Sequence, residues 1–457
     1  MMDKFIGRSH ELALLREIMS KPSASVMIYG KRKVGKTTLI MKALKGSDKK
    51  TVYYECLKAP MADNIAGFVS ELVRQQVIPV KLNFDSFVDV FAYLDSLETT
   101  VNIVLDEYPY LKEFTDPAAV DSQFQKIIDN HIGHIRLFLS GSHIGMMKDM
   151  LNEKNALYGR FSLTIQLPEL NYKEAAEFYP GKNVYDKVAF YCVFGGSPFV
   201  NSFLCPEDDL KTNIIHTILN PNSPVSNYAE HLLILDYTRS MNAERIMYAI
   251  SNGRKRYSEI EDLLGLKANG LLSKQLASLL EMEILSKVYP INKPNDKKKI
   301  AYELCDNMLR FYYAFVYKNK SALAMLGAEA FYEEYIEKPI ITFISHRFEE
   351  LCRSYFSLCV KAGKMRGVTN IGTFYYDDST AHTNGEFDVV LERRGTYDIY
   401  EVKYYASPLS LSEMEHEARQ IRDIKGLVLG DIGFVSVSGY ECDETPFVQI
   451  HGEELYD

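Results

Sequence analysis

The chain has 457 residues, more than one hydrophobic core usually supports, so two to four domains are expected. Apolar residues make up 47% and charged residues 25% of it, an ordinary balance for a soluble folded protein, and the absence of any run of 18 or more apolar residues argues against a membrane-spanning helix. The net charge of -9 arises late in the chain, because residues 341–457 hold 20 acidic and 11 basic residues and the preceding part is neutral overall.

Two further features of the sequence concern the compartment of the protein. The first ten residues carry charges where a signal peptide would be apolar. The seven cysteines are an odd number and never form a CxxC pair, so neither a disulfide framework nor a zinc site is expected. The sequence thus predicts a cytoplasmic protein with reduced thiols and without membrane contact.

Five short apolar runs in the first two-fifths of the chain predict β-strands. The stretches between them are long enough for crossover helices, which is the pattern of an α/β fold whose parallel sheet is covered on both faces. The predicted strands are residues 25–29, 51–54, 101–105, 135–139 and 163–167.

After Pro168 the pattern changes to helices, and from residue 241 helices followed by a two-stranded hairpin predict a winged helix-turn-helix, with Asn269 as the cap of its third helix. Strands return near residues 372–376, 387–391 and 398–404. The expected domains are an α/β core (1–170), a helical lid (171–240), the winged helix (241–305), a helical connector (306–340) and a C-terminal α/β domain (341–457).

Residues 30–38 contain the phosphate-binding pattern GxxxxGK[ST] between an apolar strand and a predicted helix, which is the context that this motif requires. Its glycines let main-chain N–H groups converge on phosphates at a helix N-terminus. Lys36 is expected to reach the β and γ phosphates of ATP, and the Thr37 hydroxyl to ligate magnesium. The expected nucleotide-binding residues are Gly30, Lys31, Arg32, Lys33, Val34, Gly35, Lys36, Thr37 and Thr38.

Two carboxylates follow the third apolar run, at the strand end where ligands bind in such sheets. Asp106 is expected to hold magnesium and Glu107 to polarise the attacking water as general base. The next strand ends in Ser140 and Ser142, either of which can present a hydroxyl to the γ-phosphate, although a simple turn explains them equally well. Arg160 is the candidate cation for transition-state charge, and an ordinary surface arginine is the alternative.

Together these residues resemble the archaeal-type ATPase family, a group within the AAA+ and STAND-like P-loop NTPases. The matching segments are residues 5–12, 30–38, 105–107, 140–142, 157–160 and 195–198. The resemblance implies that Gly7 and Arg8 lie near the base and ribose, and that Pro198 belongs to a helical lid over the nucleotide. It extends into the C-terminal region, where family members carry a domain of uncharacterised function.

The C-terminal domain resembles the core of PD-(D/E)XK nucleases. Asp388 ends one strand region, and Glu401 and Lys403 share a face of the next, so the carboxylates could bind magnesium while the lysine orients or deprotonates a water. Glu349 on a preceding helix and Gln420 on a following one are further candidates. The alternative is an ordinary strand pair with charges on its wet face, and the acidic balance of the domain opposes DNA unless metal or another domain compensates.

The winged-helix region carries an electrostatic hint of nucleic acid, with 11 basic against seven acidic residues in residues 243–300. Residues 253–256, Lys267 and Lys274 are expected to meet phosphates, and Ser273, Lys274 and Gln275 to approach base edges. Residues 297–299 are expected to decorate the wing. A winged helix that contacts protein is the alternative.

The sequence therefore predicts an ATP-hydrolysing, magnesium-dependent protein whose nucleotide state controls a DNA-associated winged helix and nuclease-like module. A STAND-type signalling or scaffold ATPase with an inactive C-terminal domain is the main alternative, and an ATP-gated defence nuclease differs from the first reading only in its substrate and trigger. If Arg160 acts on a neighbouring chain, the protein works as a homo-oligomer.

Overall fold

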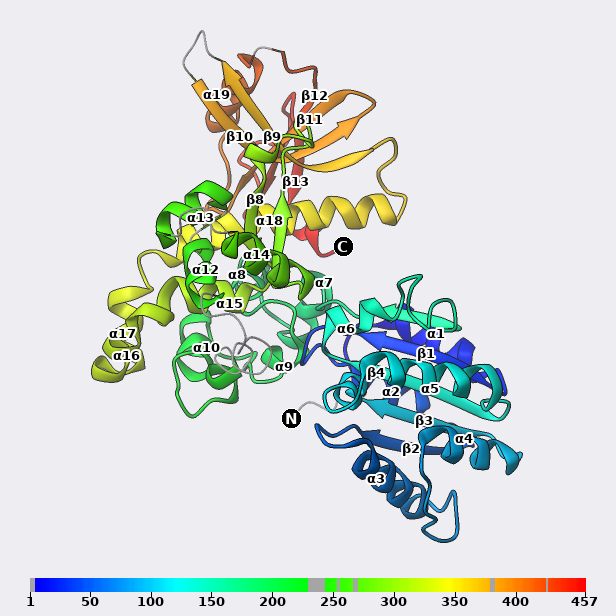
Figure 1. Ribbon diagram of the computed structural model, residues 1–457. Coiled ribbons are helices and arrows are strands. Elements are labelled where there is room, and N and C mark those ends of the chain that lie inside the picture. Colours follow the sequence, from blue (N-terminus) through cyan, green and yellow to red (C-terminus); the bar gives the residue numbers. More distant parts are fainter. Residues whose placement is uncertain are drawn as a thin grey trace. The chain divides into compact units, whose positions relative to one another are not determined.

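The structure, a computed structural model, describes residues 5–228, 243–251, 253, 255–265, 270–378, 383–424 and 426–457 (Figure 1). The chain divides into two compact units, called here the first unit (Gly7–Leu170) and the second unit (Asn171–Asp457 together with Met1–Ile6). The predicted positions Arg254, Lys267 and Asn269 lie outside the described residues. Among the helices that are described, none combines the length and the apolar character needed to cross a bilayer.

The first unit is built on a five-stranded parallel sheet with strand order β2-β3-β4-β1-β5 (Figure 1). All five predicted strands are confirmed, with bounds that differ by one or two residues. Every residue of β1, β3 and β4 is buried, as expected for strands covered on both faces. The strands are β1 (Ala24–Tyr29), β2 (Lys50–Glu55), β3 (Val101–Asp106), β4 (Ile135–Gly141) and β5 (Leu163–Gln166).

Strand order decides which side chains meet at the carboxyl edge of this sheet. β4 lies between β1 and β3, with Gly141 beside Tyr29 and Leu139 beside Leu105. The phosphate loop after β1, the acidic pair after β3 and the serines after β4 therefore emerge at the same edge. The flanking helices are α1 (Ser9–Met19), α2 (Lys36–Leu44), α3 (Met61–Arg74), α4 (Phe87–Ser96), η1 (Tyr108–Lys112), α5 (Pro117–Asn130) and α6 (Ile144–Asp149).

The second unit begins with helices and continues into helix α12, whose apolar residues join theirs in one core. Asn183, Ser197 and Asp209 cap three of these helices by accepting hydrogen bonds from backbone N–H groups. The elements of this part are α7 (Tyr172–Ala175), η2 (Ala176–Phe178), α8 (Val184–Phe194), α9 (Pro198–Asn201) and α10 (Leu210–Thr217).

Residues 243–304, called here the helix–hairpin segment, contain three helices and a small antiparallel sheet of order β6-β8-β7. The apolar faces of the three helices pack inward, with Ile246, Ile260 and Leu276 buried. The elements are α12 (Ala243–Ser251), β6 (Lys255–Arg256), α13 (Tyr257–Leu264), α14 (Leu271–Glu281), β7 (Leu285–Val288), η3 (Lys297–Lys299) and β8 (Ala301–Leu304).

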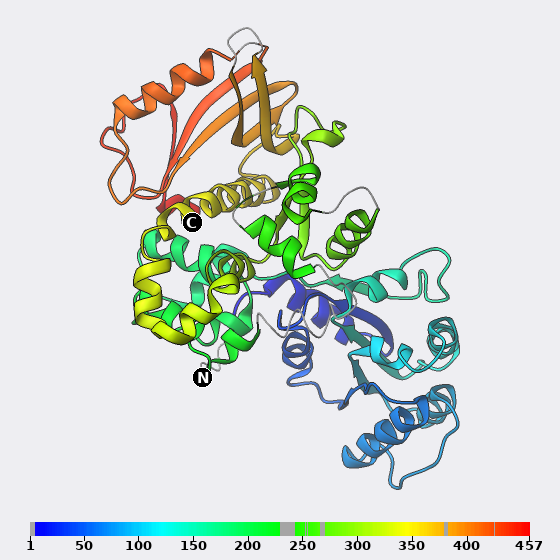
Figure 2. The same ribbon diagram turned by 60° about the vertical axis from the view of Figure 1, so that its left-hand side comes forward.

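A second five-stranded sheet, of order β13-β12-β11-β10-β9, forms the C-terminal domain, in which β9, β10 and β11 are antiparallel and β12 and β13 pair parallel (Figure 2). Neighbouring residues of β10 enter different cores, since Leu391 packs with residues of α18 and Val390 with residues of α19. The two helices thus cover opposite faces. The elements are α18 (Ile340–Lys361), β9 (Asn370–Asp378), β10 (Thr383–Arg393), β11 (Thr396–Lys403), α19 (Leu411–Arg422), β12 (Leu429–Ser436), β13 (Val448–His451) and η6 (Glu453–Leu455).

A short helical connector joins the helix–hairpin segment to α18. Its Arg310 is 2% exposed, donates to Glu350 of α18 over 2.8 Å and lies 3.6 Å from Glu303 of β8. Because a buried charge is costly without partners, these two carboxylates fix the arginine between β8 and α18. The connector comprises α15 (Asn307–Phe311), η4 (Tyr312–Val316), η5 (Tyr317–Asn319), α16 (Lys320–Leu326) and α17 (Ala328–Tyr335).

Candidate functional site

The loop between β1 and α2 has the backbone that phosphate binding requires. Gly35 has φ 92° and Lys33 φ 65°, both in the left-handed region. A Cβ on Gly30 would lie 2.2 Å from the carbonyl oxygen of Leu167, so only glycine fits against this neighbouring segment. The turn therefore brings successive N–H groups towards the start of α2.

Lys36 lies inside this loop and is only 6% exposed. Its Nζ donates to the carbonyl oxygens of Gly30 and Lys31, each over 2.9 Å. The ammonium group is thus held by the loop itself, where phosphate oxygens can replace the carbonyls as acceptors.

Asp106, at the end of β3, is 5% exposed and accepts four hydrogen bonds. Oδ2 accepts from the hydroxyls of Thr37 (2.5 Å) and Tyr53 (2.9 Å), and Oδ1 accepts from the Ser140 hydroxyl and from the backbone N–H of Glu107 (3.0 Å). Burial and the charge of Asp106 raise the pKa of Tyr53 above its usual range, so Tyr53 stays a donor. Carboxylate and hydroxyl oxygens are the ligands that Mg²⁺ prefers, and Asp106 with Thr37 fits that ion.

Glu107 is fixed in a way that its sequence position does not reveal. Its backbone has φ 50°, and its carboxylate accepts from the Ser142 N–H (3.1 Å) and from the Ser142 hydroxyl (2.8 and 2.7 Å to the two oxygens). Both serines that were expected near the γ-phosphate thus hold the acidic pair, Ser140 on Asp106 and Ser142 on Glu107.

Arg8 is 4% exposed and has a structural role in this unit. Its guanidinium donates to the carbonyl oxygens of Val34 (3.5 Å) and Pro168, and lies 3.7 Å from Glu11. It therefore ties the start of the unit to the phosphate loop. Gly7, with φ 64°, forms the turn before it, and their expected contacts with the base and ribose stay predictions.

Arg160 lies at the end of the sheet where β1 begins, whereas the phosphate loop follows the end of β1. It pairs with Asp129 near the end of α5 over 3.0 Å, and its carbonyl accepts from Ser25 near the start of β1. Because β1 separates this end from the loop, the geometry gives no support for an action of Arg160 on a nucleotide held by the same chain. Its action on a neighbouring chain stays a prediction.

The other expected nucleotide-binding residues are arranged around the loop. Lys31 lies 3.5 Å from Glu169, and Arg32 donates to the Tyr110 hydroxyl over 2.6 Å. Lys33 and Thr38 are exposed and Val34 is buried. Pro198 is the first residue of α9 in the second unit, and its place in a lid stays a prediction.

Asp388 lies at an irregularity in the pairing of the C-terminal sheet. The pairing of β10 with β9 shifts register between Phe387 and Val390. β10 pairs with β11 with Val390 opposite Ile399, and the same register continued places Asp388 beside Glu401. Bulges commonly re-aim a side chain in this manner next to functional sites.

Glu401 and Lys403 share one face of β11, and the Lys403 Nζ lies 3.6 Å from Glu401 and 2.7 Å from Glu417 of α19. Burial, opposed by the charge of Lys403, raises the pKa of Glu401. Burial alone would lower the pKa of Lys403, but its hydrogen bond to Glu417 and the charge of Glu401 raise it. Lys403 is therefore held as a cation among carboxylates.

Glu349 of α18 completes the cluster. Burial and the charge of Asp388 raise its pKa, while His346, 3.6 Å away, opposes this shift. Gln420, a further candidate for this site, is exposed, and its amide contacts His416. Glu417, one turn earlier on α19, is the residue of this helix that contacts Lys403.

The carboxylate cluster of the C-terminal domain offers few ligands to a divalent ion. Within the described residues, no group of three or more His, Cys, Asp and Glu side chains is arranged to hold a metal ion. Mg²⁺ usually keeps several waters and takes only one or two carboxylates from the protein. Asp388 and Glu401 as a pair meet that requirement.

Comparison with known families matches two stretches of the chain. Residues 5–199 match an ATPase domain found predominantly in Archaea. The first part of this chain is an archaeal-type ATPase domain. Its parallel sheet, phosphate loop and Asp106 give this ATPase domain the features of a nucleotide-binding P-loop fold. Residues 312–421 match archaeal and bacterial proteins of unknown function.

Individual relatives are more distant. An uncharacterized protein of Methanocaldococcus jannaschii is 27% identical over 324 residues, which cover 70% of each chain. A Walker-type ATPase of Pyrococcus abyssi is 17% identical, with 68% of this chain and 97% of that one covered at a TM-score of 0.48. The ORC2 protein of Aeropyrum pernix is 14% identical, with 68% and 95% covered and a TM-score of 0.47.

Outside the ATPase domain, the predicted DNA-reading helix α14 presents fewer residues than expected. Gln275 is 7% exposed and lies on the buried face, so it does not face a base edge. Lys274 and Ser273 are exposed, and the Ser273 hydroxyl lies 3.2 Å from that of Tyr257. The helical periodicity of Leu272, Leu276 and Leu279 could have excluded Gln275, because it lies between them on the same face.

Two functional residues were missed by the sequence reasoning. Tyr53 lies within a strand that carries no motif, and its contact with Asp106 depends on β2 lying next to β3. Glu417 precedes Gln420 by three positions, and helical spacing alone allowed either residue to face β11. The position of Tyr53 is therefore decided by strand order, and the choice between Glu417 and Gln420 by the rotation of α19.

Proposed function

We propose that this protein binds and hydrolyses ATP with magnesium, and that its nucleotide state controls a DNA-associated module formed by the helix–hairpin segment and the C-terminal domain. The ring of hydrogen bonds from Thr37, Tyr53 and Ser140 to Asp106 carries the first half of the proposal, together with the matched ATPase family. The convergence of Asp388, Glu401 and Lys403 on paired strands supports the second half.

In the ATPase domain, Lys36 exchanges its two carbonyl acceptors for the β and γ phosphates, and the N–H groups of the loop take the remaining oxygens. Thr37 and Asp106 hold the magnesium ion, which neutralises charge on the phosphates when bound. Glu107 must leave Ser142 to polarise the attacking water as general base.

In the C-terminal domain, Asp388 and Glu401 hold a divalent ion, which when bound polarises a phosphodiester as a Lewis acid. Lys403 orients a water or accepts its proton after separating from Glu417. Glu349 supplies a further carboxylate beside Asp388. The three helices and the small β6-β8-β7 sheet of the helix–hairpin segment support its proposed role as a winged helix. In that role its exposed Lys274 supplies a phosphate contact.

The coupling between the two activities is tested with Lys36→Ala, which is expected to lower the rate of ATP hydrolysis about 10²- to 10³-fold and to change DNA affinity in the presence of ATP. DNA affinity that is identical with and without ATP in the unmodified protein would remove the nucleotide switch from the proposal.

The site assignments are tested by measuring ATP hydrolysis and DNA cleavage on the same purified sample, with and without DNA and magnesium. Asp388→Ala and Lys403→Ala are expected to abolish cleavage and to leave ATP hydrolysis intact. Cleavage that survives both substitutions would show that the nuclease site lies elsewhere.

A second candidate is a STAND-type scaffold ATPase with an inactive C-terminal domain. The observation that favours it is the 2.7 Å contact between Lys403 and Glu417, which occupies the amino group that would act on water. ATP hydrolysis without metal-dependent cleavage, in a sample that binds DNA or a protein partner, identifies this function.

A further inference from the structure

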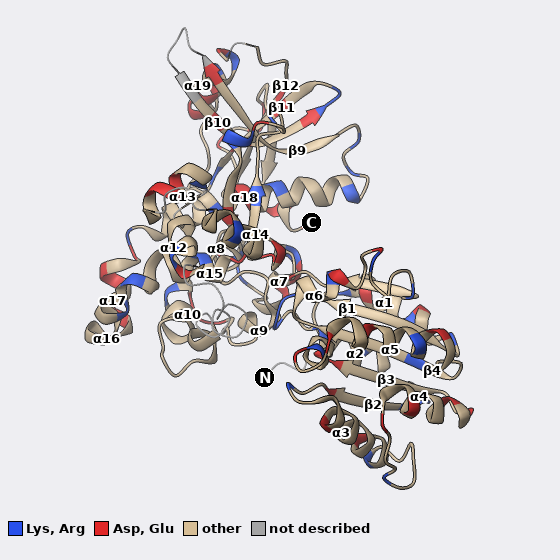
Figure 3. Ribbon diagram, in the orientation of Figure 1, with Lys and Arg blue, Asp and Glu red and all other residues tan. Residues whose placement is uncertain are grey.

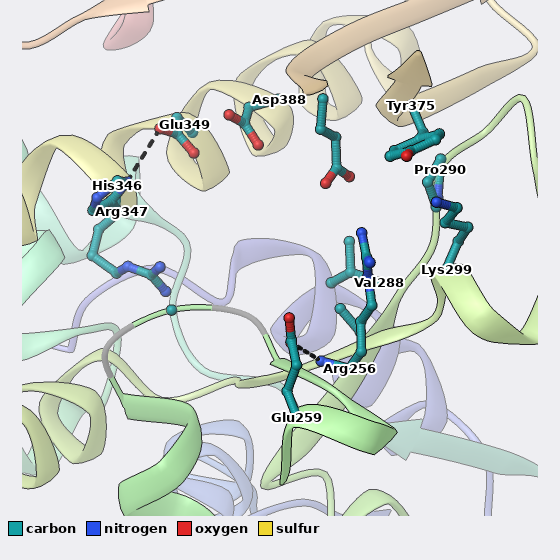
Figure 4. Close-up of a pocket in the computed structure, with 13 residues that line it drawn as sticks. Arg256, Glu259, Val288, Pro290, Lys299, His346, Arg347, Glu349, Tyr375 and Asp388 are labelled. Carbon is teal, nitrogen blue, oxygen red and sulfur yellow. Dashed lines mark hydrogen bonds and ion pairs between the residues drawn. The ribbon is translucent and has the colours of Figure 1, made fainter. Parts of the chain in front are cut away.

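A cavity of about 380 Å³ lies between the helix–hairpin segment and the C-terminal domain (Figure 4). Arg256, Lys299 and the carboxylate Glu259 line it from the helix–hairpin side. The C-terminal domain contributes Arg347, Glu349, Glu386 and Asp388, together with Tyr375 of β9. The carboxylates assigned above to metal-dependent chemistry thus face cations that a different part of the chain supplies.

The junction that forms this cavity is held by specific backbone contacts. Pro290 and Thr373 form a parallel β-bridge, and the N–H of Ile291 donates to the Thr373 carbonyl over 2.7 Å. The amide of Asn292 bonds the backbone of Tyr375 in both directions, over 2.8 and 3.1 Å. The loop after β7, which belongs to the predicted wing, is therefore joined to β9.

The two cations are fixed at the cavity wall by different means. Lys299 is half-buried, and its Nζ lies 3.5 Å from the centre of the Tyr375 ring, a cation–π contact. Arg256 belongs to β6 and pairs with Ala301 of β8, which also lines the cavity. Both residues reach the cavity from one small sheet and its adjoining turn.

These cations answer an electrostatic difficulty of the C-terminal domain. Residues 341–457 hold 20 acidic and 11 basic residues, interspersed along the helices and strands (Figure 3), a balance that repels phosphates. An arginine fork and a lysine ammonium are the usual phosphate contacts in nucleic-acid recognition. Together with Arg347 they place three cations beside the four carboxylates of the lining, and these cations are the groups that a phosphate would contact.

The size of the cavity limits what can enter. Its volume of about 380 Å³ lies within the roughly 300–1,000 Å³ of cavities that take small ligands, and one nucleotide of an unpaired strand is a ligand of that size. The major groove of B-DNA alone is about 12 Å wide and 8.5 Å deep, so a whole duplex does not enter this space.

We propose that this cavity binds the phosphate of an unpaired DNA strand, with Arg256 and Lys299 as its phosphate contacts, and that duplex DNA is not its ligand. The inference rests on the proposed nuclease function and specifies its substrate class. The helix–hairpin segment then forms one wall of the substrate site, in addition to any contact it makes with DNA elsewhere.

The test is fluorescence anisotropy of the full chain with a labelled, 5′-phosphorylated oligothymidylate and with a blunt duplex of equal length, both in EDTA so that cleavage plays no part. The double substitution Arg256→Ala with Lys299→Ala is expected to weaken oligothymidylate binding at least tenfold and to leave duplex binding unchanged. Lys297→Ala with Lys298→Ala removes the same charge from exposed residues of the same turn and is expected to change affinity less than threefold.

Equal losses in the two double variants, or a duplex that displaces the oligothymidylate as effectively as an unlabelled single strand, would overturn the inference. Arg256→Lys with Lys299→Arg keeps both charges, and recovered binding in it shows that the alanine variant did not merely misfold. Cleavage of duplex DNA that is lost in Asp388→Ala but persists in the Arg256/Lys299 alanine variant would contradict the inference while leaving the proposed function intact. Single-strand binding through these cations, without cleavage by any sample, would support the inference and contradict the proposed nuclease function.

Discussion

The nucleotide site of the ATPase domain and the carboxylate cluster of the C-terminal domain differ in how far they are already assembled. Around Asp106, hydroxyls from α2, β2 and β4 and a backbone N–H already meet one carboxylate. Around Asp388, the acidic groups come from α18, β10 and β11, and Lys403 is closest to Glu417 rather than to Glu401.

This difference follows from where the residues lie in the sequence. The phosphate loop is a single stretch, so its local backbone sets most of its geometry. The C-terminal cluster joins a helix, two strands and a second helix, so its geometry depends on packing, a bulge and helix rotation. The geometry of the nucleotide site is therefore expected to depend on individual residues of the loop. The geometry of the C-terminal cluster is expected to depend on which neighbouring side chain each residue contacts.

The largest expected effect is at Lys36. Lys36→Ala removes the cation that stabilises charge on the transferred phosphate, and the rate of ATP hydrolysis is expected to fall about 10²- to 10³-fold. Lys42→Ala, an exposed lysine on the same helix, is the control and is expected to hydrolyse ATP normally. A steady-state phosphate-release assay measures both, and normal hydrolysis by Lys36→Ala would refute the assignment of this site.

The second prediction concerns metal binding by the C-terminal cluster. Without nucleotide, Mn²⁺ at about a hundredfold excess over its Kd is expected to stabilise the protein by roughly 2.7 kcal/mol, seen as a higher Tm by calorimetry. Glu401→Gln is expected to lose this gain. Glu415→Gln, on the exposed face of α19, is expected to keep it, and a gain that persists in Glu401→Gln would place the ion elsewhere.

Gly30→Ala tests the geometry of the loop rather than its charge. The added Cβ would lie 2.2 Å from the Leu167 carbonyl oxygen, and such overpacking costs about 1–3 kcal/mol. The Tm of the ATPase domain is expected to fall by about 2–4 °C for each kcal/mol. Gly46→Ala, whose Cβ would meet nothing within 4 Å, separates the clash from the cost of a positive φ, and equal losses in both variants would argue against the close approach.

The smallest effect is expected at Ser142. Ser142→Ala removes the hydroxyl that holds Glu107, so the general base is released more readily and the basal rate of ATP hydrolysis is expected to rise a few fold. Ser70→Ala, on the exposed face of α3, is the control. A lower rate in Ser142→Ala would mean that the serine positions Glu107 for catalysis instead of restraining it.

The sequence predicted those elements whose apolar pattern is long and regular. The five parallel strands agree with the structure to within two residues, because buried parallel strands are continuous apolar runs. The residues of the phosphate loop and Asp106 meet as expected. The partners of Arg160 and Gln420 could not be predicted, because a single arginine or glutamine carries no periodic signal that indicates its neighbours.

The sequence by itself determined the phosphate loop, the carboxylates after β3 and the order of helices and strands, since each depends on residues close together in the chain. Tertiary structure alone decided that Tyr53 and Ser140 donate to Asp106 and that Glu417 forms a salt bridge with Lys403. It also decided that the turn before β8 lines the same cavity as Asp388. Such contacts depend on strand order, on a register shift and on the rotation of a helix, and these are set by the packing of segments that lie far apart in the sequence.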